Sequence, residues 1–211
     1  MKKNLVIAGL ITMLLITGCD NKTKTAQESK TDKQSNPEEI LKDMNISTNQ
    51  AKKANKVAVQ VFNDVAKVGP NDKQMILVFG TNTDPYSMKL KEDIFKSKQL
   101  QEKLKNDFSS YYFKAHENLR HKLFHEGEYM DVDTKTMINI YGITATPTLI
   151  FTDKKAKAVI MVPGYMPTKQ FLITLDFMKS KKWVGKDRKN GEVYEELKKY
   201  YISNGIEVNK K

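Results

Sequence analysis

Cysteine is nearly absent from this sequence of 211 residues, and the single example, Cys19, lies close to the amino terminus. A disulfide within one chain needs two cysteines, and thiol–disulfide exchange needs a thiolate that attacks sulfur. If Cys19 is covalently blocked, the chain holds no free thiol. The sequence therefore excludes an internal disulfide and argues against dithiol redox catalysis.

Long hydrophobic runs are also scarce. The one apolar run, from Leu5 to Ile16, follows two lysines and is too short to span a bilayer as a mature helix, so residues 1–18 are predicted to be a signal peptide. It ends in Ile16-Thr17-Gly18-Cys19, which resembles a bacterial lipobox. We therefore expect Cys19 to carry lipid (diacylglycerol and palmitate-type chains) that anchors a lipoprotein to the membrane. The alternative is an ordinary signal peptide with a chance cysteine.

Acidic residues are too few to balance the basic ones. The chain has 36 Lys and Arg against 25 Asp and Glu, a net charge of +11, and loss of Lys2 and Lys3 leaves 11 − 2 = +9. Such a charge could favour anionic lipid headgroups or acidic partners, but a compositional bias toward lysine and asparagine is the ordinary explanation and the one we prefer. We expect no nucleic-acid partner, because the leader places the protein outside the cytoplasm.

The hydrophobic content of 39% is enough for one core of ordinary size. Alanine, valine and phenylalanine recur every three or four residues between Thr48 and Val68, which predicts a helix there. A basic segment that ends in a helix, Glu192–Tyr201, closes the chain. The expected organisation is a signal peptide (1–18), a flexible tether (19–36), a helical extension (37–70), one α/β domain (71–180) and a basic C-terminal tail (181–211).

Within that domain, short apolar runs predict strands and apolar residues at helical spacing predict helices. The polar segment 116–132 has no clear assignment. The predicted strands are 75–79, 111–113, 149–151 and 159–162; the predicted helices begin at Asp84 and Leu100 and span Thr134–Tyr141 and Thr168–Met178.

Two sequence motifs lie where these elements begin. Asp84-Pro85-Tyr86-Ser87 follows a buried strand and opens a helix, and Thr146-Pro147-Thr148 leads into a later strand. Together they resemble the thioredoxin-like family, in particular its periplasmic, membrane-anchored branch, over residues 74–180. That resemblance implies a central mixed sheet flanked by helices, with a cis proline at Pro147 that faces the turn. The family has Cys-Pro-Tyr-Cys where this sequence has Asp84 to Ser87, so both redox cysteines are missing.

Asp84 is predicted to cap the following helix, because an aspartate followed by proline suits the N-cap and N1 positions. A general base is the alternative, but a capped carboxylate has a low pKa, which suits a base poorly. Ser87 is expected to make hydrogen bonds in the first helical turn. Neither motif contains a histidine that would activate it as a nucleophile, so no catalytic residue is assigned.

The loop at Thr146 and Pro147 is the predicted partner-binding site. In the resembled family, the backbone before the cis proline pairs with an extended peptide of the partner, an interaction that needs no thiol. Tyr86 and Tyr165 are expected to add flat apolar contacts. The alternative is that Pro147 only fixes the shape of the loop.

All three histidines lie between residues 116 and 125. If this segment is helical, Glu117, His121 and His125 share one face at four-residue spacing, which is compatible with zinc. A solvated face of mixed charge is the ordinary interpretation, and we assign neither a metal nor another cofactor.

The sequence thus favours a redox-inactive thioredoxin-fold lipoprotein of the bacterial cell envelope that binds a protein or peptide near Pro147. The protein would face the periplasm or the cell exterior. Two alternatives are a metal-binding periplasmic lipoprotein and an envelope-assembly component that uses the fold as a spacer. Enzymatic activity is not expected.

Overall fold

The computed structural model describes residues 47–208. The signal peptide, Cys19, the tether and the first part of the expected helical extension therefore lie outside the described residues. No helix in the described part of the chain is both long enough and apolar enough to cross a membrane.

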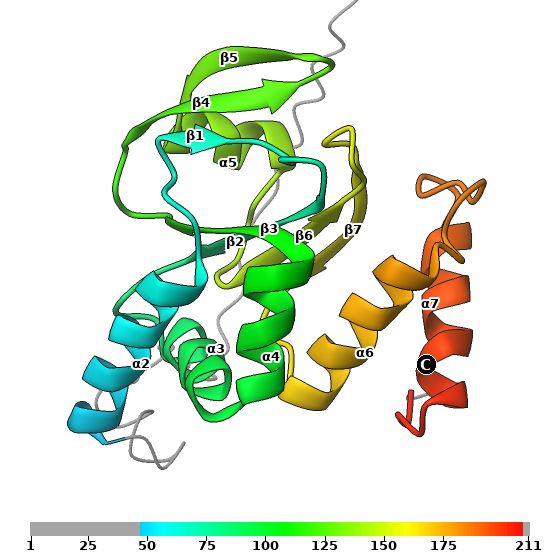
Figure 1. The fold of residues 1–211 in the computed structure, drawn as a ribbon, viewed down its shortest axis with the longest axis horizontal. Helices are drawn as coiled ribbons and strands as arrows, with labels where there is room; N and C mark the ends of the chain where they lie inside the picture. The colour runs from blue at the N-terminus through cyan, green and yellow to red at the C-terminus, as the bar shows by residue number, and fades with distance from the viewer. Residues whose placement is uncertain (1–46, 209–211) are drawn as a thin grey trace, which may run out of the picture. The chain divides into compact units, whose positions relative to one another are not determined.

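A four-stranded mixed sheet forms the centre of the domain (Figure 1). Its strands are β2 (Gln74–Gly80), β3 (Phe108–Lys114), β6 (Thr148–Thr152) and β7 (Ala158–Pro163), in the spatial order β3-β2-β6-β7. Strand β3 runs parallel to β2, whereas β6 is antiparallel to both of its neighbours. The four predicted strands all lie within these elements, and β2 is buried almost throughout because both faces of the sheet are covered.

One face of the sheet is covered by helices. These are α2 (Thr48–Val61), α3 (Pro85–Lys96), α4 (Lys98–Glu102), which continues into the π-helical turn η1 (Lys103–Asp107), α6 (Thr168–Ser180) and α7 (Glu192–Ser203). Figure 1 shows α2, α3, α4 and α6 on the same side of the sheet. Their apolar side chains form one core cluster with Ile76, Val78, Leu149 and Phe151 of the sheet.

The helix predicted over Thr48–Val68 is shorter than expected. It ends at Val61, because Phe62 adopts extended angles and the backbone N–H of Asn63 donates to the carbonyl of Ser110 on β3, at 2.8 Å. Lys67 and Val68 then form a short strand, β1. Pairing with a neighbouring strand thus overrides a helical pattern that the side chains alone support.

The other face of the sheet carries α5 (Thr134–Tyr141) and a second, three-stranded sheet in the order β1-β4-β5. Strands β4 (Arg120–His125) and β5 (Glu128–Asp133) form an antiparallel hairpin, so the polar segment that the sequence left unassigned is a hairpin. Its two-residue turn, Glu126-Gly127, has positive φ at both positions, 49° and 101°, as tight hairpins require. Helix α5 ends at Gly142 in the left-handed conformation, as predicted.

The expected C-terminal tail contributes to the domain core. Helix α7 buries Val193, Leu197 and Tyr201, and the hydroxyl groups of Tyr201 and Thr174 on α6 lie 2.6 Å apart. Tyr194 reaches the backbone N–H of Met161 on the edge strand β7, at 3.2 Å. The basic residues around this helix therefore lie on an ordered, packed element.

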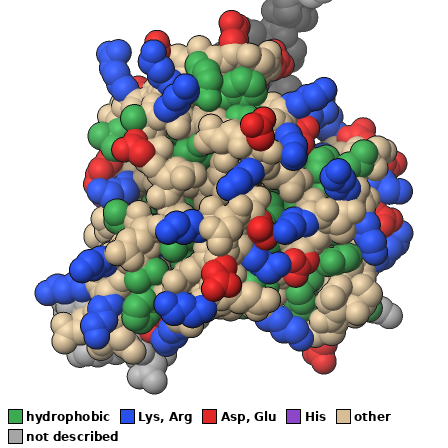
Figure 2. Space-filling view, viewed as in Figure 1, with side chains coloured by type: hydrophobic (Ala, Val, Ile, Leu, Met, Phe, Trp, Pro, Cys, Tyr) green, Lys and Arg blue, Asp and Glu red, His purple; other side chains and the backbone are tan. Residues whose placement is uncertain are grey.

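Basic and acidic side chains are interspersed on the face seen in Figure 2. This distribution agrees with a solvated surface of mixed charge. On this face, the net positive charge of the chain is not gathered into one basic patch.

Candidate functional site

The turn Asp84-Pro85-Tyr86-Ser87 and the loop at Thr146-Pro147 lie at the same end of the central sheet. Phe79 near the end of β2 pairs with Thr148 at the start of β6, and Thr148 pairs with Pro163 at the end of β7. The turn that begins at Thr81 and the loop that ends at Pro147 therefore leave the sheet side by side. This is the neighbourhood that the family resemblance implies.

Asp84 is the N-cap of α3, as predicted, with Pro85 at the first helical position. Its Oδ1 accepts a hydrogen bond from the backbone N–H of Tyr86 at 3.0 Å, and its Oδ2 accepts one from that of Ser87 at 3.2 Å. Oδ2 also accepts a bond from the Ser87 hydroxyl, at 2.5 Å. Both carboxylate oxygens are thus used to hold the first turn.

Ser87 is completely buried and ties the turn to the helix. Its hydroxyl donates to Asp84 and accepts a hydrogen bond from the backbone N–H of Thr81, at 3.1 Å. The prediction of a first-turn hydrogen-bonding role is confirmed. A serine held in this way, with no histidine beside it among the described residues, is not placed as a nucleophile.

Asp84→Ala is expected to lower the free energy of unfolding by about 0.5–2 kcal/mol, the range for loss of an N-cap. Asp84→Asn should have an intermediate effect, because the amide keeps one acceptor oxygen whereas the structure uses two. Urea unfolding of both variants and the wild type measures the difference. If Asn proves as harmful as Ala, the negative charge rather than the capping geometry is what stabilises the turn.

The Thr146-Pro147 peptide bond is cis, as predicted. The Pro147 ring is buried, Thr146 is half-buried, and Thr144 and Ala145 are exposed. The carbonyl of Pro147 accepts from the backbone N–H of Gly164, at 2.7 Å, and that of Ala145 accepts from the Thr148 hydroxyl, also at 2.7 Å. Within residues 47–208, the backbone N–H and C=O of Thr146 make no hydrogen bond, which leaves them available to an added strand.

The two tyrosines expected beside the loop differ in their environments. Tyr86 is 52% exposed and free to contact a partner. The hydroxyl of Tyr165 instead donates to the carboxylate of Asp93, which also pairs with Lys89. Burial and this carboxylate raise the pKa of Tyr165 well above its ordinary value. Tyr165 is therefore held against α3, and Tyr86 is the better-placed contact residue.

The helical spacing proposed for Glu117, His121 and His125 is wrong, because β4 is a strand. His121 is 2% exposed, and its two ring nitrogens lie 2.8 Å from the carbonyl of Val65 and 2.8 Å from the hydroxyl of Thr134. His125 is exposed near the hairpin turn. Residues 47–208 contain no group of three His, Cys, Asp or Glu side chains arranged to hold a metal ion.

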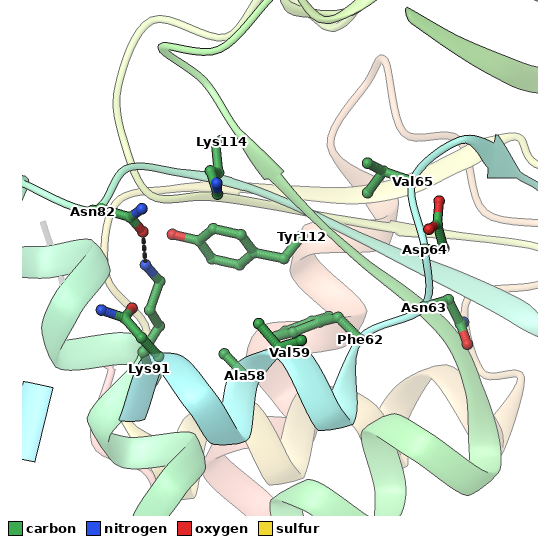
Figure 3. A pocket seen from close by; sticks show the side chains of 11 residues that line it. Ala58, Val59, Phe62, Asn63, Asp64, Val65, Asn82, Lys91, Tyr112 and Lys114 are labelled. Carbon is green, nitrogen blue, oxygen red and sulfur yellow. Dashed lines mark hydrogen bonds between the residues drawn. The ribbon is translucent and has the colours of Figure 1, made fainter. Parts of the chain in front are cut away.

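Lys91 is a polar residue of this region that the sequence did not single out. It lies on α3, is only 3% exposed, and its Nζ donates to Asn82 Oδ1 at 2.6 Å and to the carbonyl of Thr81 at 3.1 Å (Figure 3). Burial lowers the pKa of Lys91 to about 8, with repulsion from Lys114 adding to the shift and attraction to Asp84 opposing it. In the sequence its neighbours are charged residues typical of a solvated helix face, so nothing in the local sequence indicates that Lys91 is buried.

The buried amine of Lys91 predicts a pH-dependent stability. Between about pH 8 and pH 10.5 the unfolded chain holds a proton on Lys91 that the folded chain lacks, so the free energy of unfolding rises with pH in this window. Below pH 8 the buried charge destabilises the fold. The wild type should therefore gain on the order of 1–2 kcal/mol relative to Lys91→Met between pH 7 and pH 10, since hydrogen bonds to the ammonium offset part of the desolvation.

Urea unfolding of the two proteins at both pH values tests this expectation, with Lys56→Met as the control from an exposed lysine on α2. Titration of the other groups is common to all three proteins and cancels in the comparison. An unchanged difference between wild type and Lys91→Met would show that the amine does not titrate in this window.

Comparison with known proteins gives the same fold. Residues 61–179 match the model of a family described as thioredoxin-like domain. A solved thioredoxin-fold protein from Helicobacter pylori is 32% identical, with a TM-score of 0.66 over 72% of this chain and 96% of that chain. No curated protein sequence matches that of the chain.

Two further solved structures resemble the chain less closely. One is an uncharacterized thioredoxin-like protein from Clostridium perfringens, with 16% identity and a TM-score of 0.38 over 59% of this chain and 89% of that chain. The other is a DsbH oxidoreductase, with 13% identity and a TM-score of 0.35 over 65% of this chain and 82% of that chain. Since the family model spans more than half of the sequence and the Helicobacter pylori relative is matched over nearly its whole length, the chain belongs to the thioredoxin-like family.

Proposed function

We propose that the protein binds an extended peptide segment of a partner at the loop before Pro147, without redox chemistry. The observation that carries this proposal is the backbone of Thr146, which makes no hydrogen bond within residues 47–208 and lies next to the exposed residues Thr144 and Ala145. The turn that carries exposed Tyr86 leaves the same end of the sheet. A peptide that lies along this loop gains main-chain hydrogen bonds as an added strand, and Tyr86 supplies a flat apolar surface for its side chains.

Redox chemistry is excluded from this role by the residues themselves. Position 84 holds a carboxylate and position 87 a buried hydroxyl, and the sequence has no cysteine after Cys19. A mixed disulfide cannot form without a thiolate. The partner is therefore held by reversible, non-covalent contacts, which suits recognition or assembly in the cell envelope.

Photo-crosslinking from the loop tests the peptide-binding role. A benzoylphenylalanine at exposed Thr144 should capture a defined protein in intact membranes, identified by mass spectrometry. The same probe at Lys155, in the exposed turn at the opposite end of the sheet, should not capture it. Tyr86→Ala should reduce the yield of the crosslink several-fold, whereas Ile202→Ala, which removes a side chain that is 58% exposed on α7, should not. Equal capture from positions 144 and 155 would contradict the assignment.

The proposed role places the protein at a bacterial membrane through lipid on Cys19. The support is the sequence Ile16-Thr17-Gly18-Cys19 after a short apolar run. Cys19→Ala should leave the precursor unprocessed and abolish labelling by a clickable fatty acid, because the thioether to diacylglycerol can no longer form. Labelling that persists in Cys19→Ala would rule out this anchor.

A further inference from the structure

A cavity of about 560 Å³ lies apart from the Pro147 loop, between the second half of α2 and the carboxyl end of β3. Neither Thr146 nor Pro147 lines it. Ala58, Val59 and Phe62 form its apolar side, and the Tyr112 ring packs against Phe62, with 5.6 Å between the ring centroids (Figure 3). Its volume lies within the range typical of sites for small organic ligands.

Both ends of this cavity are polar, and they carry opposite charges. Lys91 and Lys114 lie at one end together with Asn82, whereas Asp64 lies at the other (Figure 3). An occupant with one negative group would be attracted to the lysine end and repelled by Asp64. The cavity therefore favours one orientation of an anionic, partly apolar molecule.

The lysine end has a cation that lacks an anionic partner. The printed hydrogen bonds of Lys91 run to a carbonyl and an amide oxygen, and its Nζ lies 4.7 Å from the centroid of the Tyr112 ring. Within the described residues, no carboxylate is hydrogen-bonded or ion-paired to Lys91: Asp84, which attracts it at a distance, is engaged in the cap of α3. A buried cation without an anionic partner is unfavourable, and an arriving carboxylate relieves that cost.

The mouth of the cavity carries one charged and one large apolar side chain. Lys114 is half-exposed and already pairs with both carboxylate oxygens of Glu117, at 2.8 and 3.1 Å, so Lys91 is the cation at this end that an incoming carboxylate would pair with. Val59 is 80% exposed, a large apolar side chain in contact with water on the other side of the mouth. A ligand that contacts Val59 and also pairs with Lys91 needs both an apolar body and a negative group.

We propose that this cavity binds a small organic carboxylate with an apolar body, its carboxylate against Lys91 and its apolar part against Val59 and Phe62. The site is separate from the proposed peptide-binding loop, since neither Thr146 nor Pro147 lines it, and oxygen atoms of the Thr81-Asn82 turn hold Lys91.

Calorimetric titration of the full chain with 4-phenylbutyrate, and with 4-phenylbutanamide as its neutral analogue, tests the site. The acid should bind at least tenfold more tightly than the amide. Lys91→Met should remove this preference, whereas Lys56→Met, which removes an equal charge from the exposed face of α2, should keep it. Detergent that keeps the lipid-anchored chain in solution also takes up some of each probe, but this loss is the same for all variants and cancels when their affinities are compared.

Val59→Asp provides a second variant that does not disturb the core, because the side chain lies at the surface. It places a negative charge at the mouth and should weaken binding of the acid at least tenfold, while Val59→Asn has a much smaller effect. Equal affinity for acid and amide in the wild type, or a preference for the acid that survives both Lys91→Met and Val59→Asp, overturns the proposal.

Discussion

The double variant Asp84→Cys/Ser87→Cys is expected to form an internal disulfide and to acquire disulfide reductase activity that the wild type lacks. The two side chains already meet in the first turn of α3, with Ser87 Oγ 2.5 Å from Asp84 Oδ2. Residues three apart at a helix start lie within the roughly 4.4–6.8 Å between Cα atoms that a disulfide spans. The helix N-terminus should also lower the pKa of the first thiol below about 8.5.

Alkylation and mass spectrometry measure this disulfide, in a chain where Cys19→Ser removes the remaining thiol. The single variants serve as controls, and burial predicts their behaviour. The cysteine at position 84 should react with iodoacetamide, because Asp84 is half-buried, whereas the one at position 87 should be protected, because Ser87 is fully buried. A folded double variant that stays reduced under oxidising conditions would show that this turn is not equivalent to the redox turn of the family.

Gly80→Ala is expected to lower the free energy of unfolding by about 1–3 kcal/mol, the range for overpacking a well-packed site. Gly80 ends β2 directly before the turn, and a Cβ there would lie 2.2 Å from the hydroxyl oxygen of Tyr112 and 2.9 Å from Ser87 Oγ. Neither neighbour can withdraw freely, since the Tyr112 hydroxyl donates to the carbonyl of Thr81 and Ser87 holds the cap.

Tyr112→Phe isolates the cause of this destabilisation. Alone, it loses the hydrogen bond to Thr81, a net effect of about 0.5–1.5 kcal/mol. In combination with Gly80→Ala it removes the oxygen that clashes most closely with the new Cβ. The double variant should therefore be less destabilised than the sum of the single variants, as measured by urea unfolding. Strict additivity would mean that the Tyr112 hydroxyl is not what requires glycine at position 80.

The local sequence was sufficient where a short segment contains its own physical cause. Asp84-Pro85 predicts a helix start because the capping carboxylate and the first free N–H groups are only two and three residues apart. Gly142 predicts the end of α5 because the left-handed conformation favours glycine. The continuous apolar run of β2 predicts a strand covered on both faces, and the family motifs place that strand beside β6.

The sequence was insufficient where a residue's environment is supplied by segments far along the chain. The end of α2 depends on pairing between Asn63 and β3, more than forty residues later. His121 belongs to a hairpin and is enclosed by Val65 and Thr134, so its spacing from other histidines is irrelevant. Burial of Lys91 depends on the turn at Thr81 and Asn82 and on Tyr112, which no helical pattern around it reveals.

The sequence by itself therefore indicated the fold family, through two motifs that resemble it. It also determined the capped turn without cysteines and the cis-proline loop, because each of these follows from residues adjacent in the chain. Only the tertiary structure decided that Tyr165 is held by Asp93, that Tyr86 is left exposed, and that Lys91 lines a cavity with no carboxylate bonded to it among residues 47–208. The physical reason is that desolvation and unmet hydrogen-bonding capacity depend on every neighbour of a group, and those neighbours come from separate elements brought together by packing.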